Sequence, residues 1–197
     1  RDRANLIQTP SIAERAQQGR QVGYAIITVG LIGIGIAFWK LWSLFVLGKA
    51  VRSQAGSKVL DVRNPLGRVL KAGEENFNKD IDTLELKLAE AIMAERPSIE
   101  RGIGAVRIIS VVAPLAGLLG TVTGMIVTFQ MITLYGTGDP KLMAGGISQA
   151  LVTTVLGLLV AIPTTLLHSF TASSAKGIIG VLEEQSTGIL AERAETK

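Results

Sequence analysis

Cysteine is absent from the 197-residue chain, which excludes disulfide bonds and thiol chemistry. The charge imbalance is also small, because 20 Lys and Arg residues stand against 16 Asp and Glu residues, a formal net charge of +4. The basic residues are mixed with acids and flank apolar stretches. This distribution favours a membrane-side charge bias over nucleic-acid binding.

Charged side chains are missing from three long stretches, residues 21–39, 108–138 and 142–175. About 20 apolar residues are needed to cross the hydrocarbon of a bilayer. The first stretch gains length from residues 41–47 beyond Lys40, whose stem can carry its amine to the headgroups. Strand alternation is absent, so helices must satisfy the backbone polar groups in lipid. The sequence therefore predicts an all-α integral membrane protein with three transmembrane helices and cytoplasmic helical extensions.

The ends of these stretches divide the chain. We expect an outer-side (periplasmic) amphipathic lead-in at 1–20, transmembrane helices at 21–47, 106–135 and 145–172, a cytoplasmic helical region at 48–105, a periplasmic turn at 136–144 and a cytoplasmic C-terminal helix at 173–197. Most Lys and Arg residues outside the spans lie in the two segments assigned to the cytoplasm, so positive-inside bias puts the N-terminus outside and the C-terminus inside. The chain begins with Arg1, so we expect that something precedes it.

The segment between the first two spans contains an amphipathic helical pattern. Within KDIDTLELKLAEAIMAE, residues Ile81, Leu84, Leu88 and Ile92 recur at helical spacing among charged side chains. We expect this apolar stripe to need partners that cover it.

Small and hydroxyl-bearing residues form one face of the second span, which contains APLAGLLGTVTGM at residues 113–125. Steps of three and four residues place on this face Ser110, Pro114, Gly117, Thr121, Gly124 and Thr128. The third span repeats the pattern with Gly146, Ala150, Thr154, Gly157, Ala161, Thr165 and His168. The first span contains glycines but lacks such a stripe, and we interpret it as a lipid-facing anchor.

Two explanations of the stripes stay open. Small residues let helix backbones approach closely, and Ser or Thr can donate hydrogen bonds across the contact. Alternatively, the stripes face a pore or a charged partner group. Pro114 and Pro163 each remove a backbone donor and free a carbonyl, which predicts kinks beside the stripes.

Acidic residues are missing from all three spans, although an intramembrane proton carrier is normally ionisable. His168 is the one titratable candidate, and it lies near the inner end of the third span. If the protein moves protons, another chain must supply the carboxylate. The spans contain no acid pair, metal-ligand cluster or nucleophile–base set, and the rest of the chain has no phosphate loop. We therefore expect no enzyme activity, cofactor or metal.

The two motifs, APLAGLLGTVTGM and GGISQALVTTVLGLLVAIP at residues 145–163, resemble the signature of the MotA/TolQ/ExbB proton-channel family. The resemblance runs from about Leu84 to Phe170 and includes the approach to the second span, ERPSIERGIGAVRIISVVAP. The large insert between the first and second spans is similar to ExbB and TolQ, since MotA-like proteins have four spans. The missing start and the amphipathic stretch before the first span resemble the longer outer-side extension of ExbB-like proteins of accessory TonB systems.

The resemblance implies a homopentameric ring in the bacterial inner membrane that encloses single-span helices of an ExbD- or TolR-like partner, which brings the titrating Asp. It places Thr121 and Thr154 at the family's pore threonines, and adds Gln149 and Thr128 to the expected proton path. Gln149 stands where relatives usually have Glu. The expected packing and kink residues are Pro114, Gly117, Gly120, Gly124, Gly146, Ala150, Gly157, Ala161 and Pro163.

The function implied by the resemblance is that of a proton-channel subunit in a motor that energises TonB-dependent outer-membrane transport. Its expected partners are the ExbD- or TolR-like protein, a TonB-like protein, further copies of the chain and the lipid bilayer, with no nucleic acid. A TolQ-like subunit of a Tol-type envelope motor and a non-conducting membrane scaffold are the alternatives.

Overall fold

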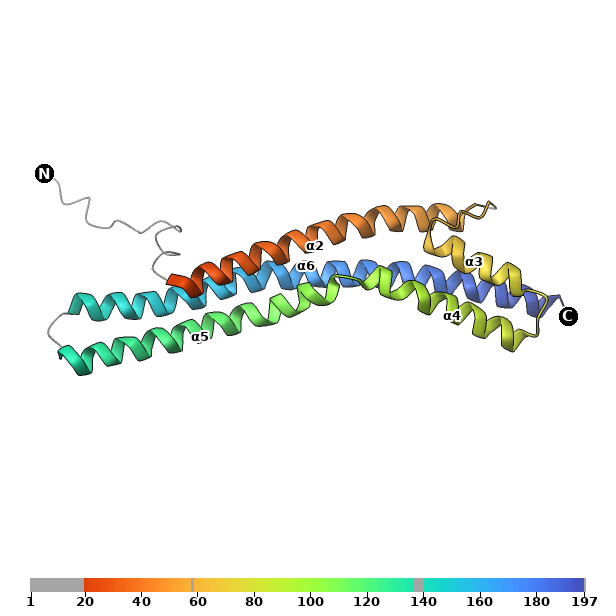
Figure 1. Cartoon of the computed structure of the whole chain (residues 1–197). Helices are drawn as coiled ribbons and strands as arrows, with labels where there is room; N and C mark the ends of the chain where they lie inside the picture. The colour runs from red at the N-terminus through yellow and green to blue at the C-terminus, as the bar shows by residue number, and fades with distance from the viewer. Residues whose placement is uncertain (1–19, 58, 137–139, 197) are drawn as a thin grey trace, which may run out of the picture. The chain divides into compact units, whose positions relative to one another are not determined.

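The computed structural model describes residues 20–57, 59–136 and 140–196. Over these ranges the regular secondary structure is α-helical, which confirms the predicted all-α class. The helices are α2 (Arg20–Ala55), α3 (Pro65–Asn76), α4 (Ile81–Glu100), α5 (Ile103–Tyr135) and α6 (Pro140–Glu195) (Figure 1). The lead-in predicted for 1–20 lies outside the described residues except for Arg20, which begins α2.

Within the described ranges, three helices are long and apolar enough to cross a membrane, over Val22–Ala55, Ile103–Leu134 and Met143–Glu195. The first continues past the predicted end at residue 47, because no Gly or Pro breaks the α2 sequence between Lys49 and Ala55. In Figure 1 the third span and the C-terminal helix form one uninterrupted helix, α6. The boundary expected between residues 172 and 173 is therefore not a helix end.

A glycine separates the second span from the helix before it. Gly102 lies between α4 and α5 with a φ of 87°, a left-handed conformation that a residue without a Cβ adopts at little cost. The two prolines of the stripes, Pro114 and Pro163, lie inside α5 and α6, both of which continue through them. The chain therefore breaks at Gly102 and not at either proline.

The chain divides into two compact units. The first takes residues up to Gly35 and residues 105–166, so α2, α5 and α6 all contribute to it. Ile26, Ala113, Leu156 and Val160 form its buried cluster. The glycines of the first span also pack closely here, because a Cβ on Gly30 would lie 2.5 Å from the Val160 side chain. The first span therefore packs closely against α6 and is not only a lipid-facing anchor.

The second unit contains residues 36–104 and 167–197 and has a larger core. Its buried residues include Leu44, Val51, Leu66, Val69, Leu84, Leu88, Ile99, Ile178, Ile179 and Leu182. Leu84 and Leu88 of the predicted amphipathic stripe are fully buried in it. The segments that cover these two residues of the stripe come from the same chain, because α3 and the second half of α6 lie in the same cluster.

Polar caps fix the short helices of the second unit. The Asn64 side chain accepts a hydrogen bond from the Gly67 N–H at 2.8 Å and caps α3, which Pro65 begins. Asp80 caps α4 in the same way, accepting from the Thr83 N–H at 3.0 Å. Both helices start where the sequence supplies an oxygen for the unpaired backbone donors of the first turn.

Two basic side chains connect helices of the second unit through hydrogen bonds. The Lys40 amine, on a side chain only 6% exposed, donates to the Ser98 carbonyl at 3.2 Å and so joins α2 to the last turn of α4. Arg68 of α3 makes two hydrogen bonds of 2.6 Å to the Glu95 carboxylate of α4. The hydrogen bonds that Arg68 donates to Glu95 raise the pKa of its guanidinium.

Candidate pore-lining and helix-packing site

The α5 and α6 backbones meet at glycines of the two stripes. A Cβ on Gly117 would lie 2.8 Å from the Thr153 carbonyl oxygen, and a Cβ on Gly157 would lie 2.7 Å from the Ala113 carbonyl oxygen. Real Cβ atoms do not approach backbone oxygen so closely, so neither position accepts a side chain without movement. The stripes of the second and third spans therefore face each other within one chain.

Further small residues extend this contact toward the α5–α6 turn. A Cβ on Gly120 would meet the Thr153 side chain at 2.5 Å, and one on Gly124 would meet the Ala150 Cβ at 2.8 Å. Gly146 packs against the Thr128 side chain in the same manner. This series of small residues runs along both helices and supports the packing interpretation of the stripes.

The two threonines expected at the pore come together in the middle of this contact. The Thr121 and Thr154 hydroxyls are in hydrogen-bond contact with each other, across 33 positions of sequence. The Thr121 hydroxyl also lies 3.1 Å from the Ala150 carbonyl oxygen, and the Thr154 hydroxyl lies 3.3 Å from that of Gly117. Both side chains are half-buried, so one side of the pair stays accessible in the single chain.

The other two expected path residues lie in different surroundings. Thr128 is buried, and its hydroxyl donates to the Gly124 carbonyl of its own helix at 2.9 Å. Gln149 is half-buried and precedes Ala150, which is fully buried against Gly124. The structure therefore brings Thr121 and Thr154 together and keeps Thr128 in the packed interface.

The remaining packing candidates differ in burial. Ala161 is buried, and its carbonyl accepts from the hydroxyls of Thr164 and Thr165. Pro114 and Pro163 are half-buried. His168, the titratable candidate, is half-buried in the second unit.

Thr153 also belongs to this contact, although the sequence pattern did not predict it. This side chain is 3% exposed and its hydroxyl donates to the Ala150 carbonyl at 2.7 Å and lies 3.2 Å from the Gly117 carbonyl oxygen. It therefore shares the Gly117 acceptor with Thr154, and the two adjacent threonines both contact α5. The sequence signal for Thr153 is its position next to Thr154, because a helix face wider than one residue per turn includes both threonines.

The described part of the chain contains no group of three or more His, Cys, Asp or Glu side chains placed to hold a metal ion. Its membrane-spanning helices place hydroxyls and backbone carbonyls at the α5–α6 contact. Such groups can donate and accept hydrogen bonds and hold water, but at neutral pH they do not change charge. These features define a helical multi-pass membrane protein whose last two spans join through small and hydroxyl-bearing residues.

Comparison with known proteins assigns this architecture to a family. The profile of the MotA/TolQ/ExbB proton channel family matches residues 61–184, well over half of the chain. The chain belongs to the MotA/TolQ/ExbB proton channel family. The match contains both motifs on which the resemblance was based and confirms it.

Individual relatives agree with this assignment. The chain is 31% identical over 180 residues to a putative biopolymer transport protein ExbB homolog of Methanothermobacter thermautotrophicus, covering 81% of this chain and 62% of that protein. It is 48% identical over 58 residues to the biopolymer transport protein ExbB of Aquifex aeolicus, covering 29% of this chain and 39% of the other.

A relative from the Tol branch matches as well. The Tol-Pal system protein TolQ of Pseudomonas aeruginosa is 27% identical over 152 residues, 72% of this chain and 65% of that protein. In each of these three matches the chain covers less than two thirds of the relative's length.

Proposed function

We propose that this chain is the proton-channel subunit of a membrane motor that uses the proton motive force to energise TonB-dependent outer-membrane transport, together with an ExbD-like partner. Family membership and the ExbB names of two relatives support this role. The observation that carries the proposal is the half-buried pair of hydroxyls on Thr121 and Thr154, within segments 106–135 and 145–172, which contain no Asp or Glu.

The hydroxyl pair suits a partner group that changes protonation. Each hydroxyl has one donor hydrogen and two acceptor lone pairs. The contact between the two hydroxyls and the carbonyls of Ala150 and Gly117 can take up both donor hydrogens, and each hydroxyl oxygen still has a free lone pair. These lone pairs accept a hydrogen bond from a protonated carboxyl or from water. A carboxylate on a partner helix thus supplies the charge that this chain lacks.

The assembled state follows from the same role. In our proposal a homopentameric ring lies in the bacterial inner membrane, with α5 and α6 lining a central space that holds the ExbD-like helix. The N-terminus is periplasmic and the C-terminus cytoplasmic, with cytoplasmic segments at 48–105 and 173–197. A TonB-like protein receives the mechanical output. Each proton that crosses supplies about 2.3 kcal/mol per 100 mV, so work on such a protein needs several protons.

Three threonine substitutions test the proposal. Thr154→Val keeps the shape of the side chain but removes its hydroxyl, and we expect loss of proton-driven uptake with the partner still bound. Thr123→Val is the matched control, because Thr123 is exposed and its hydroxyl bonds only carbonyls of α5 among the described residues. Thr154→Ser should restore uptake. Undiminished uptake in Thr154→Val would refute the pore role.

The TolQ relative supports a second candidate, a subunit of a Tol-type envelope motor. This candidate uses the same hydroxyl pair but a TolR-like partner. Co-purification with each candidate partner separates the two. A non-conducting scaffold is distinguished by the valine test, since packing through Gly117 and Gly157 does not require a hydroxyl at position 154.

A further inference from the structure

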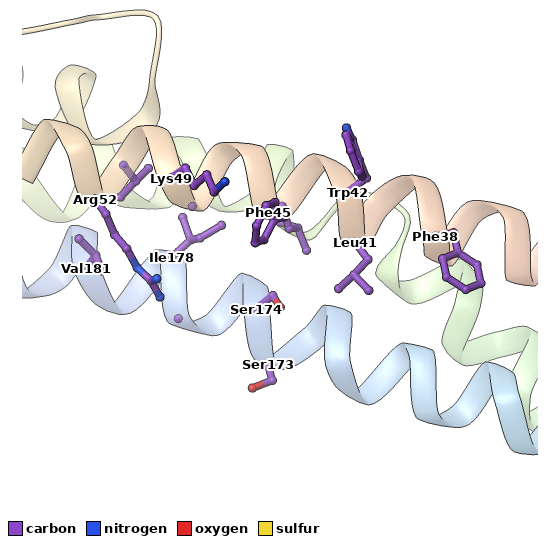
Figure 2. Close-up of a pocket in the computed structure, with 14 residues that line it drawn as sticks. Phe38, Leu41, Trp42, Phe45, Lys49, Arg52, Ser173, Ser174, Ile178 and Val181 are labelled. Carbon is purple, nitrogen blue, oxygen red and sulfur yellow. The ribbon is translucent and has the colours of Figure 1, made fainter.

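A groove lies between α2 and the second half of α6, entirely within the second unit. Its volume is about 710 Å³, and its walls come from residues 38–52 and 173–181. Figure 2 shows Leu41 directed toward α6 and Arg52 reaching across from α2, whereas Trp42 points away from α6. The groove is therefore an opening between two helices of one chain.

The chemistry of the groove changes along its length. Phe38, Leu41 and Phe45 make one end apolar, and Lys49 and Arg52 make the other end positive. The Lys49 amine lies 4.4 Å from the centroid of the Phe45 ring, where the two ends meet. Two serines, Ser173 and Ser174, add hydroxyls from α6 (Figure 2).

The positive end has no acidic counterpart. The lining contains no Asp or Glu, and among the described residues neither Lys49 nor Arg52 forms a salt bridge. Two cations side by side on a helix repel each other unless an anion lies between them. The positive end is thus complementary to a negatively charged group, and the apolar end to a hydrocarbon chain.

The surrounding aromatics indicate the depth of this groove in a membrane. Trp39 and Trp42 are 70% and 73% exposed, on the same helix as the two cations and about two to four turns before them. Exposed Trp side chains concentrate at the level of lipid headgroups. Residues 38–45 of the apolar end lie at the same level of α2 as these two Trp residues, so this end begins at the membrane interface. The Lys49 amine, beside the Phe45 ring, then lies near the level of lipid phosphates.

We propose that this groove binds an anionic phospholipid, with its headgroup phosphate at Lys49 and Arg52 and an acyl chain along Phe38, Leu41 and Phe45. Basic pockets between membrane helices bind anionic headgroups by this complementarity. The proposal rests on the chain's being a membrane protein and not on its conducting protons. The lipid fills a gap that the two helices leave in their own packing.

Lipid retention tests the proposal on the full chain. The protein is purified in detergent, mixed with equal amounts of phosphatidylglycerol and phosphatidylcholine, and its bound lipids are counted by native mass spectrometry. We expect preferential retention of phosphatidylglycerol, and a preference about tenfold or more weaker in Lys49→Gln/Arg52→Gln. The control Lys71→Gln/Lys87→Gln removes two cations outside the groove and should keep the preference. Equal preference in the wild type and the groove variant would overturn the proposal.

A second pair of variants tests the apolar end. Gly177 lines the groove, and a Cβ there meets nothing within 4 Å, so Gly177→Leu fills the groove without a backbone clash. It should lower the retention of both lipids, whereas Gly180→Leu, on the same helix with equally open space but outside the lining, should not. Equal lipid retention in the two variants contradicts an acyl chain in the groove.

A second copy of the chain is the competing occupant. Because the chain has no cysteine, Ser174→Cys introduces a single thiol into the lining. Efficient cross-linking between copies through this thiol in a lipid bilayer would show that protein covers the groove and would overturn the proposal. Labelling of the thiol by a lipid carrying a reactive acyl chain would support it.

Discussion

Gly117 of α5 and Gly157 of α6 face each other with no side chain between their backbones. The Gly157 Cα lies 3.2 Å from the position that a Gly117 Cβ would occupy, and the reverse distance is 3.1 Å. This contact brings two membrane-spanning helices of one chain together and sets the distance between the Thr121 and Thr154 hydroxyls. The packing and the proposed proton path therefore depend on the same residues.

Gly157→Ala should destabilise this contact. The added methyl would lie 2.7 Å from the Ala113 carbonyl oxygen, so the helices must separate, at a typical cost of about 1–3 kcal/mol for an overpacked interface. Gly145→Ala is the matched control on the same helix, because a Cβ there meets nothing within 4 Å and alanine favours helix. Thermal unfolding in detergent should show a lower midpoint only for Gly157→Ala. Equal midpoints would refute the close contact.

Lys40 illustrates how a cation inside an apolar helix can be structural. Its amine donates to the Ser98 carbonyl, one of the last carbonyls of α4, which have no partner within their own helix. Lys40→Met keeps the length of the side chain but removes the donor. We expect a loss of about 1–3 kcal/mol, the usual cost of leaving a buried acceptor unpaired. Chemical unfolding measures this loss.

Two controls accompany this substitution. Lys40→Arg retains a donor and should recover part of the stability, and Lys176→Met removes an exposed amine from α6 and should have little effect. If Lys40→Met and Lys176→Met had equal stabilities, the Lys40–Ser98 hydrogen bond would contribute nothing.

The cap of α4 predicts a pH dependence. Hydrogen bonds from the side chain and backbone of Thr83 hold the pKa of Asp80 below its ordinary value of 3.8. Because the folded pKa is lower than the unfolded one, the stabilisation is complete above the unfolded pKa and is lost as the pH falls through the folded pKa. Stability of the second unit should therefore fall below about pH 4.

Two asparagine variants isolate this effect. Asp80→Asn keeps a capping oxygen but cannot titrate, so its hydrogen exchange in the first turn of α4 should depend less on pH between about 2 and 5 than that of the wild type. Asp82→Asn changes a first-turn acid that is not the cap and should retain the wild-type dependence. Identical pH dependence in all three proteins would exclude Asp80 as the titrating cap.

The three long apolar helices and the small-residue faces can be predicted from the sequence, because both follow from local composition and helical spacing. Ser110 and Gly117 share a face in any α-helix, whatever surrounds them. The continuation of α6 past residue 172 was harder to predict, since composition changes there without a helix-breaking residue. Charge marks a membrane boundary but does not end a helix.

Contacts between distant segments were not predictable in the same way. The burial of Leu84 and Leu88 depends on α3 and on residues 178–182, and no local pattern says which segment covers an apolar stripe. The Lys40–Ser98 hydrogen bond joins residues 58 positions apart for the same reason. Thr153 was not predicted, because a stripe of one residue per turn is narrower than the face of α6 that contacts α5.

Gln149 offers a test of the proposed path, at a position where the resemblance to ExbB and TolQ leads us to expect a carboxyl group in relatives. Its side chain is half-buried, one residue before the tightly packed Ala150. An amide at this position donates and accepts hydrogen bonds at every pH. If the path passes this side chain, proton flow in the wild type is independent of titration at position 149.

Gln149→Glu should make uptake depend on pH in a new way. A carboxyl in partly apolar surroundings has a pKa above its usual value of about 4.3, so it titrates nearer to neutral pH. We expect proton-driven uptake by this variant to change between about pH 5 and 7, where the wild type stays level. Gln130→Glu, an exposed position on α5, is the control and should follow the wild type. The measurement is proton-driven uptake across this pH range. If Gln149→Glu and Gln130→Glu showed the same pH profile, position 149 would lie outside the proton path.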